Sequence, residues 1–275
     1  MAEIIGLCNQ KGGVGKTTTA INLAASIAAA EKRTLLIDFD PQSNSSSGLG
    51  FQKNSINTNS YKLILEGSPI EPQKTALPFL DLIPATSHLV GAEVEMVAMD
   101  QREFCLKRAL EGYLGDYDFI FIDSPPSLGL LTLNVLTASH SLLVPLQCEY
   151  YALEGLSDLM QTIELVKGSL NSNLRIGGIL LTMYDARNNL AHDVEEEIRR
   201  HFGDLVFRTV IPRNVRLSEA PSHGKPVLLY DIKSKGSESY LTLAQEFLGR
   251  MQSQVNAGAM VMPLPEQTRN AVGNE

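Results

Sequence analysis

Residues 7–24 read LCNQKGGVGKTTTAINLA, and this stretch decides the fold. It contains the G-K-T run of a phosphate-binding loop, whose pattern is G-x-x-x-x-G-K-[ST], with Lys16 and Thr17 at the last two positions. Gln10 stands where the first glycine of that pattern belongs, and a second lysine, Lys11, follows it. The loop lies between an apolar run and a helical pattern, which is the context that such a loop requires. The stretch therefore predicts a nucleotide-binding α/β protein whose loop carries one lysine more than the pattern needs.

Length and composition favour a single globular domain. The chain has 275 residues, of which 44% are apolar and 20% are charged, as in ordinary soluble proteins. The net charge of −8 argues against a protein that coats nucleic acid through its overall charge, but a local basic patch stays open. Aromatic residues make up only 6%, so the chain offers few platforms for stacking bases. Three isolated cysteines, Cys8, Cys105 and Cys148, lack metal-ligand spacing, and we expect reduced thiols in a cytoplasmic protein.

Short apolar runs alternate with helical patterns along most of the chain. The runs are rich in Ile, Leu, Val and Phe and barely alternate with polar residues, as expected of strands that are covered on both faces. This order predicts a doubly wound, mostly parallel β-sheet flanked by helices, with ligands at the carboxyl ends of the strands. The predicted strands are residues 3–8, 33–39, 80–85, 118–123, 141–147 and 176–183, and the predicted helices are residues 16–31, 99–112, 128–138, 152–168, 190–201 and 236–250.

The end of the chain differs in composition from the rest. Tyr240, Leu243 and Phe247 recur at helical spacing and mark the apolar face of a last helix. The stretch that follows, QSQVNAGAMVMPLPEQTRNAVGNE, has little periodicity and two prolines. We therefore expect one domain over residues 1–251 and a disordered tail over residues 252–275.

The loop supplies the groups that bind phosphate. Glycines lack a Cβ atom, so their backbone N–H groups can turn toward phosphate oxygens at close range. The helix that begins near Lys16 adds the positive end of its dipole. We expect Lys16 to reach the β- and γ-phosphates and the Thr17 hydroxyl to bind Mg²⁺. The glycines concerned are Gly12, Gly13 and Gly15.

Two later segments supply carboxylates. YDFIFIDSPP, residues 117–126, ends a strand at Asp123 and is typical of a Walker B motif, whose carboxylate contacts Mg²⁺ directly or through water. LLIDFDPQ, residues 35–42, ends another strand with Asp38 and Asp40, whose spacing of two directs both side chains to the same side. Asp40 lies nearer the strand end and is the candidate for orienting the attacking water. Asp38 is expected to support the site or the metal shell.

The segments KGGVGKTT, DFDPQ and FIDSPP together resemble the deviant Walker A, A′ and B motifs of the ParA/MinD group of P-loop ATPases. Other stretches, among them QCEYYALEGL and VIPRNVRLSEAPSHGKP, are similar to the chromosomal ParA (Soj) branch, and the likeness runs from about residue 3 to residue 250. The resemblance implies a homodimer that sandwiches two ATP molecules with Mg²⁺ and binds double-stranded DNA without sequence preference. It also implies a ParB-type centromere-binding partner that stimulates slow hydrolysis, and a cytoplasmic, nucleoid-associated protein that segregates chromosomes or plasmids.

The resemblance assigns roles to single residues. Lys11 matches the signature lysine, which reaches the partner subunit's nucleotide, and Gly12 matches the glycine at the tight dimer contact. Lys16 and Thr17 match the phosphate and Mg²⁺ ligands, and Asp40 matches the hydrolytic carboxylate. The implied catalytic residues are Lys11, Lys16 and Asp40. The remaining matches are Gly13, Val14, Gly15 and Thr18 in the ATP-binding loop, Met183, Pro212 and Asn214 beside the adenine, and the DNA-contacting Arg187 and Arg216.

A local basic segment favours DNA binding apart from the resemblance. Residues 205–235 contain six cations and two carboxylates within an acidic chain, although charge alone fits an ordinary solvated face equally well. The cations are Arg208, Arg213, Arg216, Lys225, Lys233 and Lys235, and the carboxylates are Glu219 and Asp231.

Three other kinds of protein share such a loop. A MinD-like membrane-associated positioning ATPase would need a basic amphipathic helix at its C-terminus, whereas Arg269 is the single basic residue after Met251. A nitrogenase-type iron protein would need one cluster cysteine from each subunit, but Cys105 and Cys148 lie outside the expected context. Ser124 stands where some relatives have cysteine. The third alternative is a ligase that phosphorylates a carboxylate.

Overall fold

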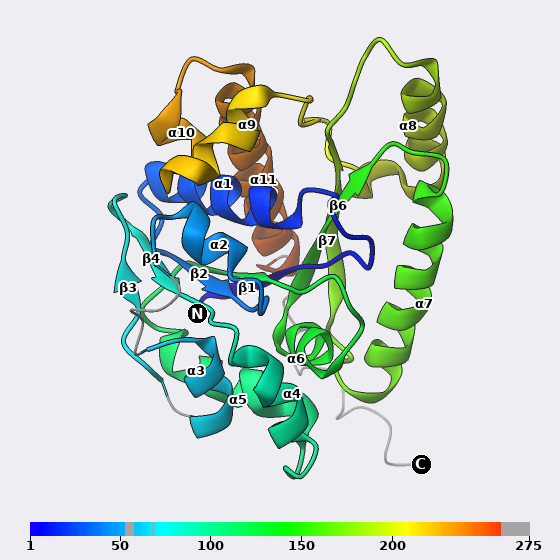
Figure 1. Cartoon of the computed structure of the whole chain (residues 1–275). Helices are drawn as coiled ribbons and strands as arrows, with labels where there is room; N and C mark the ends of the chain where they lie inside the picture. The colour runs from blue at the N-terminus through cyan, green and yellow to red at the C-terminus, as the bar shows by residue number, and fades with distance from the viewer. Residues whose placement is uncertain (53–57, 68, 260–275) are drawn as a thin grey trace, which may run out of the picture.

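One seven-stranded sheet forms the centre of the protein, as a computed structural model describes it over residues 1–52, 58–67 and 69–259 (Figure 1). The strand order is β3-β4-β2-β5-β1-β6-β7, and neighbours run parallel except for β3, which pairs antiparallel with β4 at one edge. The predicted doubly wound, mostly parallel sheet is confirmed. The strands are β1 Glu3–Leu7, β2 Thr34–Asp38, β3 Gln73–Lys74, β4 Leu80–Ile83, β5 Phe119–Asp123, β6 Ser141–Gln147 and β7 Arg175–Thr182.

Helices cover both faces of the sheet. Helices α1, α9, α10 and α11 lie on one face, and α3 to α8 lie on the other, with α7 and α8 beside the β7 edge (Figure 1). The helices are α1 Lys16–Ala29, α2 Asn44–Gly48, α3 Ser60–Glu66, α4 Leu89–Met96, α5 Cys105–Leu110, α6 Leu130–Ala138, α7 Ala152–Ser169, α8 Asn189–Phe202, α9 Val215–Glu219, α10 Val227–Tyr230 and α11 Lys235–Ala259.

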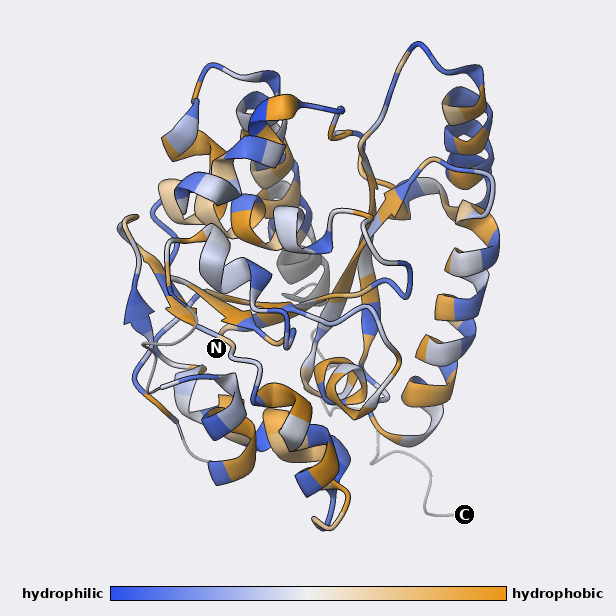
Figure 2. Cartoon of the chain, viewed as in Figure 1, coloured by the Kyte–Doolittle hydropathy of each residue, from blue (hydrophilic) through white to orange (hydrophobic). Residues whose placement is uncertain are grey.

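Consecutive residues of a central strand enter different cores. In β1, Ile4 packs into the core under α3 to α8, and Ile5 packs into the core under α1 and α11. In β2, Leu35 and Leu36 divide in the same way. Because both faces of each strand are buried, the sequence of these strands is continuously apolar rather than alternating. The coloured ribbon shows the same apolar centre (Figure 2).

The last helix packs against the first. Tyr240 of α11 is buried, and its hydroxyl lies 3.1 Å from the Thr19 hydroxyl of α1. Further along α11, the Phe247 ring contacts the rings of Phe119 and Phe121 at centroid distances of 5.7 and 5.8 Å. These contacts join the C-terminal helix to the helix of the phosphate-binding loop and to the middle of the sheet.

Several elements differ from the sequence predictions. Helix α11 continues to Ala259, so residues 252–259 of the predicted tail are helical, and residues 260–275 lie outside the described part of the chain. The helix predicted over residues 99–112 is instead α5 with one 3-10 turn before it and another after it. Strand β3 and helices α2, α3, α4, α9 and α10 were not predicted. Most of them are too short to display a period, and α4 has no side-chain cap among the described residues.

Candidate nucleotide-binding site

The loop between β1 and α1 has the backbone shape of an anion cradle. Gly13 and Gly15 have φ angles of +76° and +87°, which L residues with side chains rarely adopt. No described side chain caps the N-terminus of α1, and its first turn carries no acidic residue. The N–H groups at the start of the helix therefore face the loop without a competing anion, as phosphate binding requires.

Lys16 curls back over its own loop. Its Nζ donates hydrogen bonds to the carbonyl oxygens of Asn9, at 2.9 Å, and Lys11, at 3.2 Å. Burial lowers the pKa of Lys16, while the negative charges of Asp123 and Asp40 act in the opposite direction. The cation is thus held at the mouth of the loop by neutral carbonyl groups. Phosphate oxygens would replace these groups as stronger, charged acceptors.

Asp123 and Thr17 are suited to Mg²⁺. Asp123 is fully buried at the end of β5, and its Oδ2 accepts a hydrogen bond of 2.8 Å from the Ser45 hydroxyl. Its Oδ1 has no hydrogen-bond partner of good geometry among the described residues. Burial raises the pKa of Asp123, while the Ser45 and Thr17 hydroxyls lower it. A buried carboxylate oxygen without a partner, beside a hydroxyl, matches the hard oxygen donors that Mg²⁺ prefers, with phosphates and water as the other ligands.

The two aspartates at the end of β2 occupy different environments. Asp38 is fully buried and accepts hydrogen bonds from the backbone and hydroxyl of Ser46, at 2.7 and 2.6 Å. Burial and the charge of Asp123 raise the pKa of Asp38. Asp40 instead lines the cavity beside the loop, and its Oδ1 accepts the backbone N–H of Gln42 at 2.9 Å. The geometry therefore assigns Asp38 to holding α2 and leaves Asp40 facing the ligand space.

A cavity of about 730 Å³ lies beside the loop at the carboxyl ends of the strands. The Thr182 hydroxyl at the end of β7 donates to the Val14 carbonyl at 2.8 Å and so fixes the loop against the sheet. Met183 follows with a φ of +48°, a conformation uncommon for a side-chain residue. Asn214 caps α9 by accepting the backbone N–H of Arg216 at 2.9 Å. The structure brings these predicted residues to the cavity wall: Gly12, Gly13, Gly15, Lys16, Thr17, Thr18, Asp40, Met183, Pro212 and Asn214.

Sequence reasoning missed part of this wall. Pro126 was quoted only as part of the strand-terminal motif, and it lines the cavity three residues beyond Asp123. Tyr240 reaches the cavity from α11, and no local pattern links it to the loop, which lies more than 200 residues earlier. The remaining lining residues without a predicted role are Gln42, Asn44, Thr182, Ile211, Arg213, Val215, Leu217, Ser218 and Pro221.

Lys11 does not line the cavity of its own subunit. Its Nζ forms an ion pair with Glu149, in the segment between β6 and α7, and its side chain is 45% exposed. Its backbone N–H donates to the Asn9 side chain at 2.9 Å, which orients the start of the loop. Gly12, next to it, has open space on its Cα, because no heavy atom lies within 4 Å of where a Cβ would stand.

The two predicted DNA-contacting arginines lie outside the cavity and are engaged in ion pairs. Arg187, in the segment between β7 and α8, pairs with Asp185 at 2.8 Å and lowers the pKa of that carboxyl. Arg216 on α9 pairs with Glu219 at 2.8 Å and with Asp231 at 3.2 Å. Both side chains are exposed by half or more, so both can reach a ligand in solution.

Comparisons with known proteins find a matching family model and relatives of high identity. A family model described as an AAA domain matches residues 2–176. The chromosome partitioning protein ParA of Myxococcus xanthus is 59% identical over 252 residues, covering 91% of this chain and 89% of the relative. The sporulation initiation inhibitor protein Soj of Bacillus subtilis is 56% identical over 248 residues, covering 90% and 98%.

A solved structure of similar fold contains nucleotide and metal. It is the cobyrinic acid a,c-diamide synthase from Mycobacterium smegmatis with bound ADP and magnesium, which is 35% identical with a TM-score of 0.80, covering 92% of this chain and 97% of that one. The septum site-determining protein MinD from Pyrococcus horikoshii, complexed with Mg-ADP, is 24% identical with a TM-score of 0.71, covering 90% and 96%. The second likeness concerns the fold alone.

Proposed function

The chain belongs to the ParA/Soj family of P-loop ATPases, and from this premise we propose that it is an ATP-switched DNA-partition protein. In the proposed cycle, two ATP-bound subunits join face to face, and the dimer binds DNA without sequence preference. A ParB-type partner stimulates hydrolysis and releases the dimer. Repeated rounds on the nucleoid of the cytoplasm would segregate chromosomes or plasmids.

Several residues of the chain have distinct roles in the proposed hydrolysis. The loop N–H groups and Lys16 bind the phosphates, and Asp40 orients the attacking water from the cavity wall. Thr17 and Asp123 would hold Mg²⁺, which neutralises phosphate charge. Asp38 acts through Ser46 and the backbone of Asp40 to keep the water-orienting carboxylate in position.

The position of Lys11 is the observation that carries the proposed dimer. It lies outside its own cavity, on an exposed part of the loop, and Glu149 already neutralises it there. Gly12 beside it faces open space, so nothing in its own subunit requires a glycine at that position. A lysine that serves the other subunit's phosphates, over a glycine that permits close approach, accounts for both features. ATP would then be held completely only when two copies meet.

Non-specific DNA binding is proposed for the surface that carries Arg187 and Arg216. Two arginines per subunit give at least about four phosphate contacts in a dimer and a log–log salt slope near −3 to −4 from these contacts. A monomer offers half of these contacts, so dimerisation alone would switch the affinity. Arg216→Glu should abolish DNA binding and leave ATP-driven dimerisation intact. Wild-type affinity and salt slope in that variant would contradict the assignment.

The decisive experiment compares DNA binding with ADP, ATP and a slowly hydrolysed ATP analogue, in the wild type and in Lys11→Ala. We expect tight binding with ATP and the analogue, weak binding with ADP, and weak binding in every nucleotide state of the variant. Nucleotide binding by the variant serves as the control for folding. DNA binding that is equally tight with ADP and ATP would contradict the proposal. So would DNA binding by Lys11→Ala that still increases when ATP replaces ADP.

A further inference from the structure

A second hollow lies on the opposite face of the sheet from α11. It measures about 460 Å³ and is bounded by α4, by the 3-10 turn Arg102–Phe104, by the start of α6 and by α7. We call it the α4–α6 groove. Its lining residues are Glu93, Val97, Arg102, Glu103, Leu128, Gly129, Leu130, Leu133, Leu136 and Thr162.

The walls of the α4–α6 groove expose large apolar side chains. Val97 is 61% exposed and Leu128 is 48% exposed. Val94 and Leu165 do not line the groove, but they lie one turn from Val97 and Thr162 and are each 74% exposed. Single exposed apolar residues are common, but a group of them around one hollow marks an interaction surface. Figure 2 shows much of the ribbon of α4 and α6 in the colour of apolar residues.

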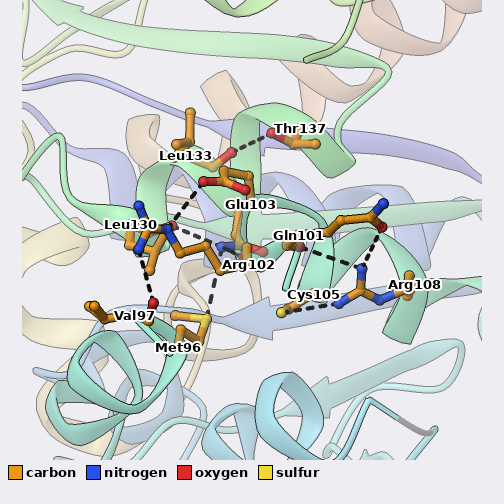
Figure 3. A network of polar contacts seen from close by, with 11 residues as sticks. Met96, Val97, Gln101, Arg102, Glu103, Cys105, Arg108, Leu130, Leu133 and Thr137 are labelled. Carbon is orange, nitrogen blue, oxygen red and sulfur yellow. Dashed lines mark hydrogen bonds and ion pairs between the residues drawn. The ribbon is translucent and has the colours of Figure 1, made fainter. Parts of the chain in front are cut away.

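The charged groups of the groove are mainly acidic. Its lining contains the carboxylates of Glu93 and Glu103 and one cation, Arg102. That cation is already used, because its guanidinium donates to the Val97 carbonyl at 3.0 Å and pairs with Glu103 at 3.2 Å (Figure 3). Among the described residues Glu93 has no ion-pair partner. Its Oε1 accepts one long hydrogen bond, of 3.3 Å, from the backbone N–H of Leu131. A ligand that carries its own cation could form an ion pair with Glu93.

The floor of the groove is already rigid. The buried Asn134 side chain donates to the carbonyl oxygens of Arg102 and Leu130, at 2.9 and 3.0 Å, and accepts the backbone N–H of Leu106 at 3.0 Å. The bonds to Arg102 and Leu106 fasten the 3-10 turn and α5 to α6, and the bond to Leu130 lies within α6. A preformed surface loses little conformational entropy when a ligand binds, which favours docking.

The groove is joined to the nucleotide cavity by a short segment. Pro126 lines the nucleotide cavity, and Leu128, two residues later, lines the groove. The same segment begins at Asp123, the candidate metal ligand. Ser124, next to it, donates to the Leu7 carbonyl of β1 at 2.7 Å. Residues 124–128 are thus the covalent link between the groove and the phosphate side of the nucleotide site.

We propose that the α4–α6 groove docks an amphipathic segment of another protein, with apolar side chains on one face and a lysine or arginine directed at Glu93. Its apolar side chains contact Val97 and Leu128, and its docking alters nucleotide release through residues 124–128. The geometry requires only the nucleotide cavity and the groove, so the inference does not depend on DNA binding or on a role in partition.

The test uses a synthetic helical peptide of about 14 residues with leucines at helical spacing and lysines between them, and a second peptide with glutamate in place of each lysine. We expect the lysine peptide to bind the full-length wild type at least about tenfold more tightly than the glutamate peptide. When it saturates the protein, we expect the release rate of a fluorescent ADP analogue to change at least about twofold. Equal affinity for both peptides, or an unchanged release rate, would overturn the proposal.

Leu128→Asp and its matched control Leu205→Asp separate docking from plain charge attraction. Leu205 is also an exposed leucine, at 37%, and it lies in the 3-10 turn Gly203–Leu205 after α8. Both variants add one negative charge, which would strengthen non-specific binding of a basic peptide. We expect Leu128→Asp to lose at least about tenfold in affinity and Leu205→Asp to bind like the wild type, with the circular-dichroism spectra of both variants matching that of the wild type.

Other occupants give distinct results, each of which overturns the proposal. If a chain that ends at residue 259 binds the peptide more tightly than the full chain, the protein's own tail competes for the groove. If Leu128→Asp dissolves a dimer in sedimentation without nucleotide, a second copy is the occupant. An unchanged affinity in Leu128→Asp places the peptide elsewhere.

Discussion

Lys11 and Lys16 stand five positions apart and occupy different environments. Lys16 is buried over its own loop, whereas Lys11 is exposed and paired with Glu149. An exposed pair of this kind stabilises a conformation by about 0.2–1 kcal/mol. We expect Glu149→Gln to release Lys11 and to shift ATP-dependent dimerisation toward lower protein concentration, by at most about fivefold. Analytical ultracentrifugation with the slowly hydrolysed analogue measures this shift.

Glu154→Gln is the matched control, because it removes a charge from the first turn of α7 that pairs with no described cation. We expect its dimerisation to match the wild type. Weaker dimerisation in Glu149→Gln would contradict the idea that Glu149 restrains Lys11 in the single subunit. It would instead mean that Glu149 receives a cation across the interface.

Asp40 and Asp38 can be separated by their effects. Asp40 faces the cavity, so Asp40→Ala should reduce ATP turnover by two orders of magnitude or more, as removal of a water-positioning base typically does, and leave an ATP-bound dimer on DNA. Turnover is measured by phosphate release, and persistence by the lifetime of the DNA complex after dilution. Unchanged turnover would exclude Asp40 from hydrolysis.

Asp38→Asn provides the comparison. Asp38 holds Ser46 and is fully buried, so its replacement should lower the melting temperature as well as turnover, whereas Asp40→Ala should change stability little. The spacing of two residues already predicted that both side chains point the same way. The spacing could not reveal that Ser46 donates two hydrogen bonds to Asp38, because the sequence of α2 shows no helical pattern.

At the scale of elements, one glutamate of α11 holds the segment beside β7. Burial alone would raise the pKa of Glu246, but the N–H groups of Arg208 and Thr209, the Thr209 hydroxyl and Arg250 hold the pKa below its ordinary value of 4.5. We expect Glu246→Gln to cost about 1–2 kcal/mol at pH 7 and to lower the melting temperature by about 3–6 °C. Glu196→Gln, in an exposed pair with Arg200, should cost less than about 0.5 kcal/mol.

The pH dependence of this effect has a definite sign. A carboxyl whose pKa is lower in the folded protein stabilises it above the unfolded pKa of about 4.5, and this contribution disappears as pH falls through the folded pKa. The difference between wild type and Glu246→Gln in urea unfolding should therefore be full at pH 6–7 and shrink below about pH 4.5. A difference that stays constant down to pH 3.5 would mean that shape rather than charge matters.

The surface around α9 and α10 has cations of two kinds. Arg216 is engaged by two carboxylates, whereas no described carboxylate pairs with Lys225, Lys233 or Lys235. If this surface meets DNA, Lys233→Ala removes one phosphate contact per subunit and makes the salt slope of a dimer less negative by about 1.8. Lys107→Ala, on α5 across the sheet, removes the same charge and should leave the slope unchanged. Equal slopes for the two variants would contradict a DNA-binding role for this surface.

The elements show which sequence signals suffice for prediction. Strands such as β5 were predicted within one residue, because four apolar residues in a row followed by Asp123 indicate a covered strand and its end. The two-residue β3 is defined only by its pairing with β4, which no local pattern encodes. Likewise, Tyr240 reaches the nucleotide cavity only because α11 packs on α1.

At the scale of the whole molecule, the absence or presence of a membrane-binding helix separates a partition ATPase from a MinD-like positioning ATPase. Across the described residues no helix is long and apolar enough to cross a bilayer. Membrane-surface binding would need a basic amphipathic helix, and the chain beyond Met251 has a single cation, Arg269. We expect no ATP-dependent sedimentation with anionic vesicles at physiological salt. ATP-dependent pelleting would favour the MinD-like alternative over the proposed function.

The packing of α11 on α1 means that the nucleotide cavity is completed late in synthesis. Helix α1 is among the first elements to leave the ribosome, but Thr19 meets its partner Tyr240 only after nearly all of the chain has been synthesised. Domains form as units during synthesis, so a nascent chain holds an unfinished nucleotide pocket until its last helix emerges. Until then the cavity beside the phosphate-binding loop lacks the wall that Tyr240 provides.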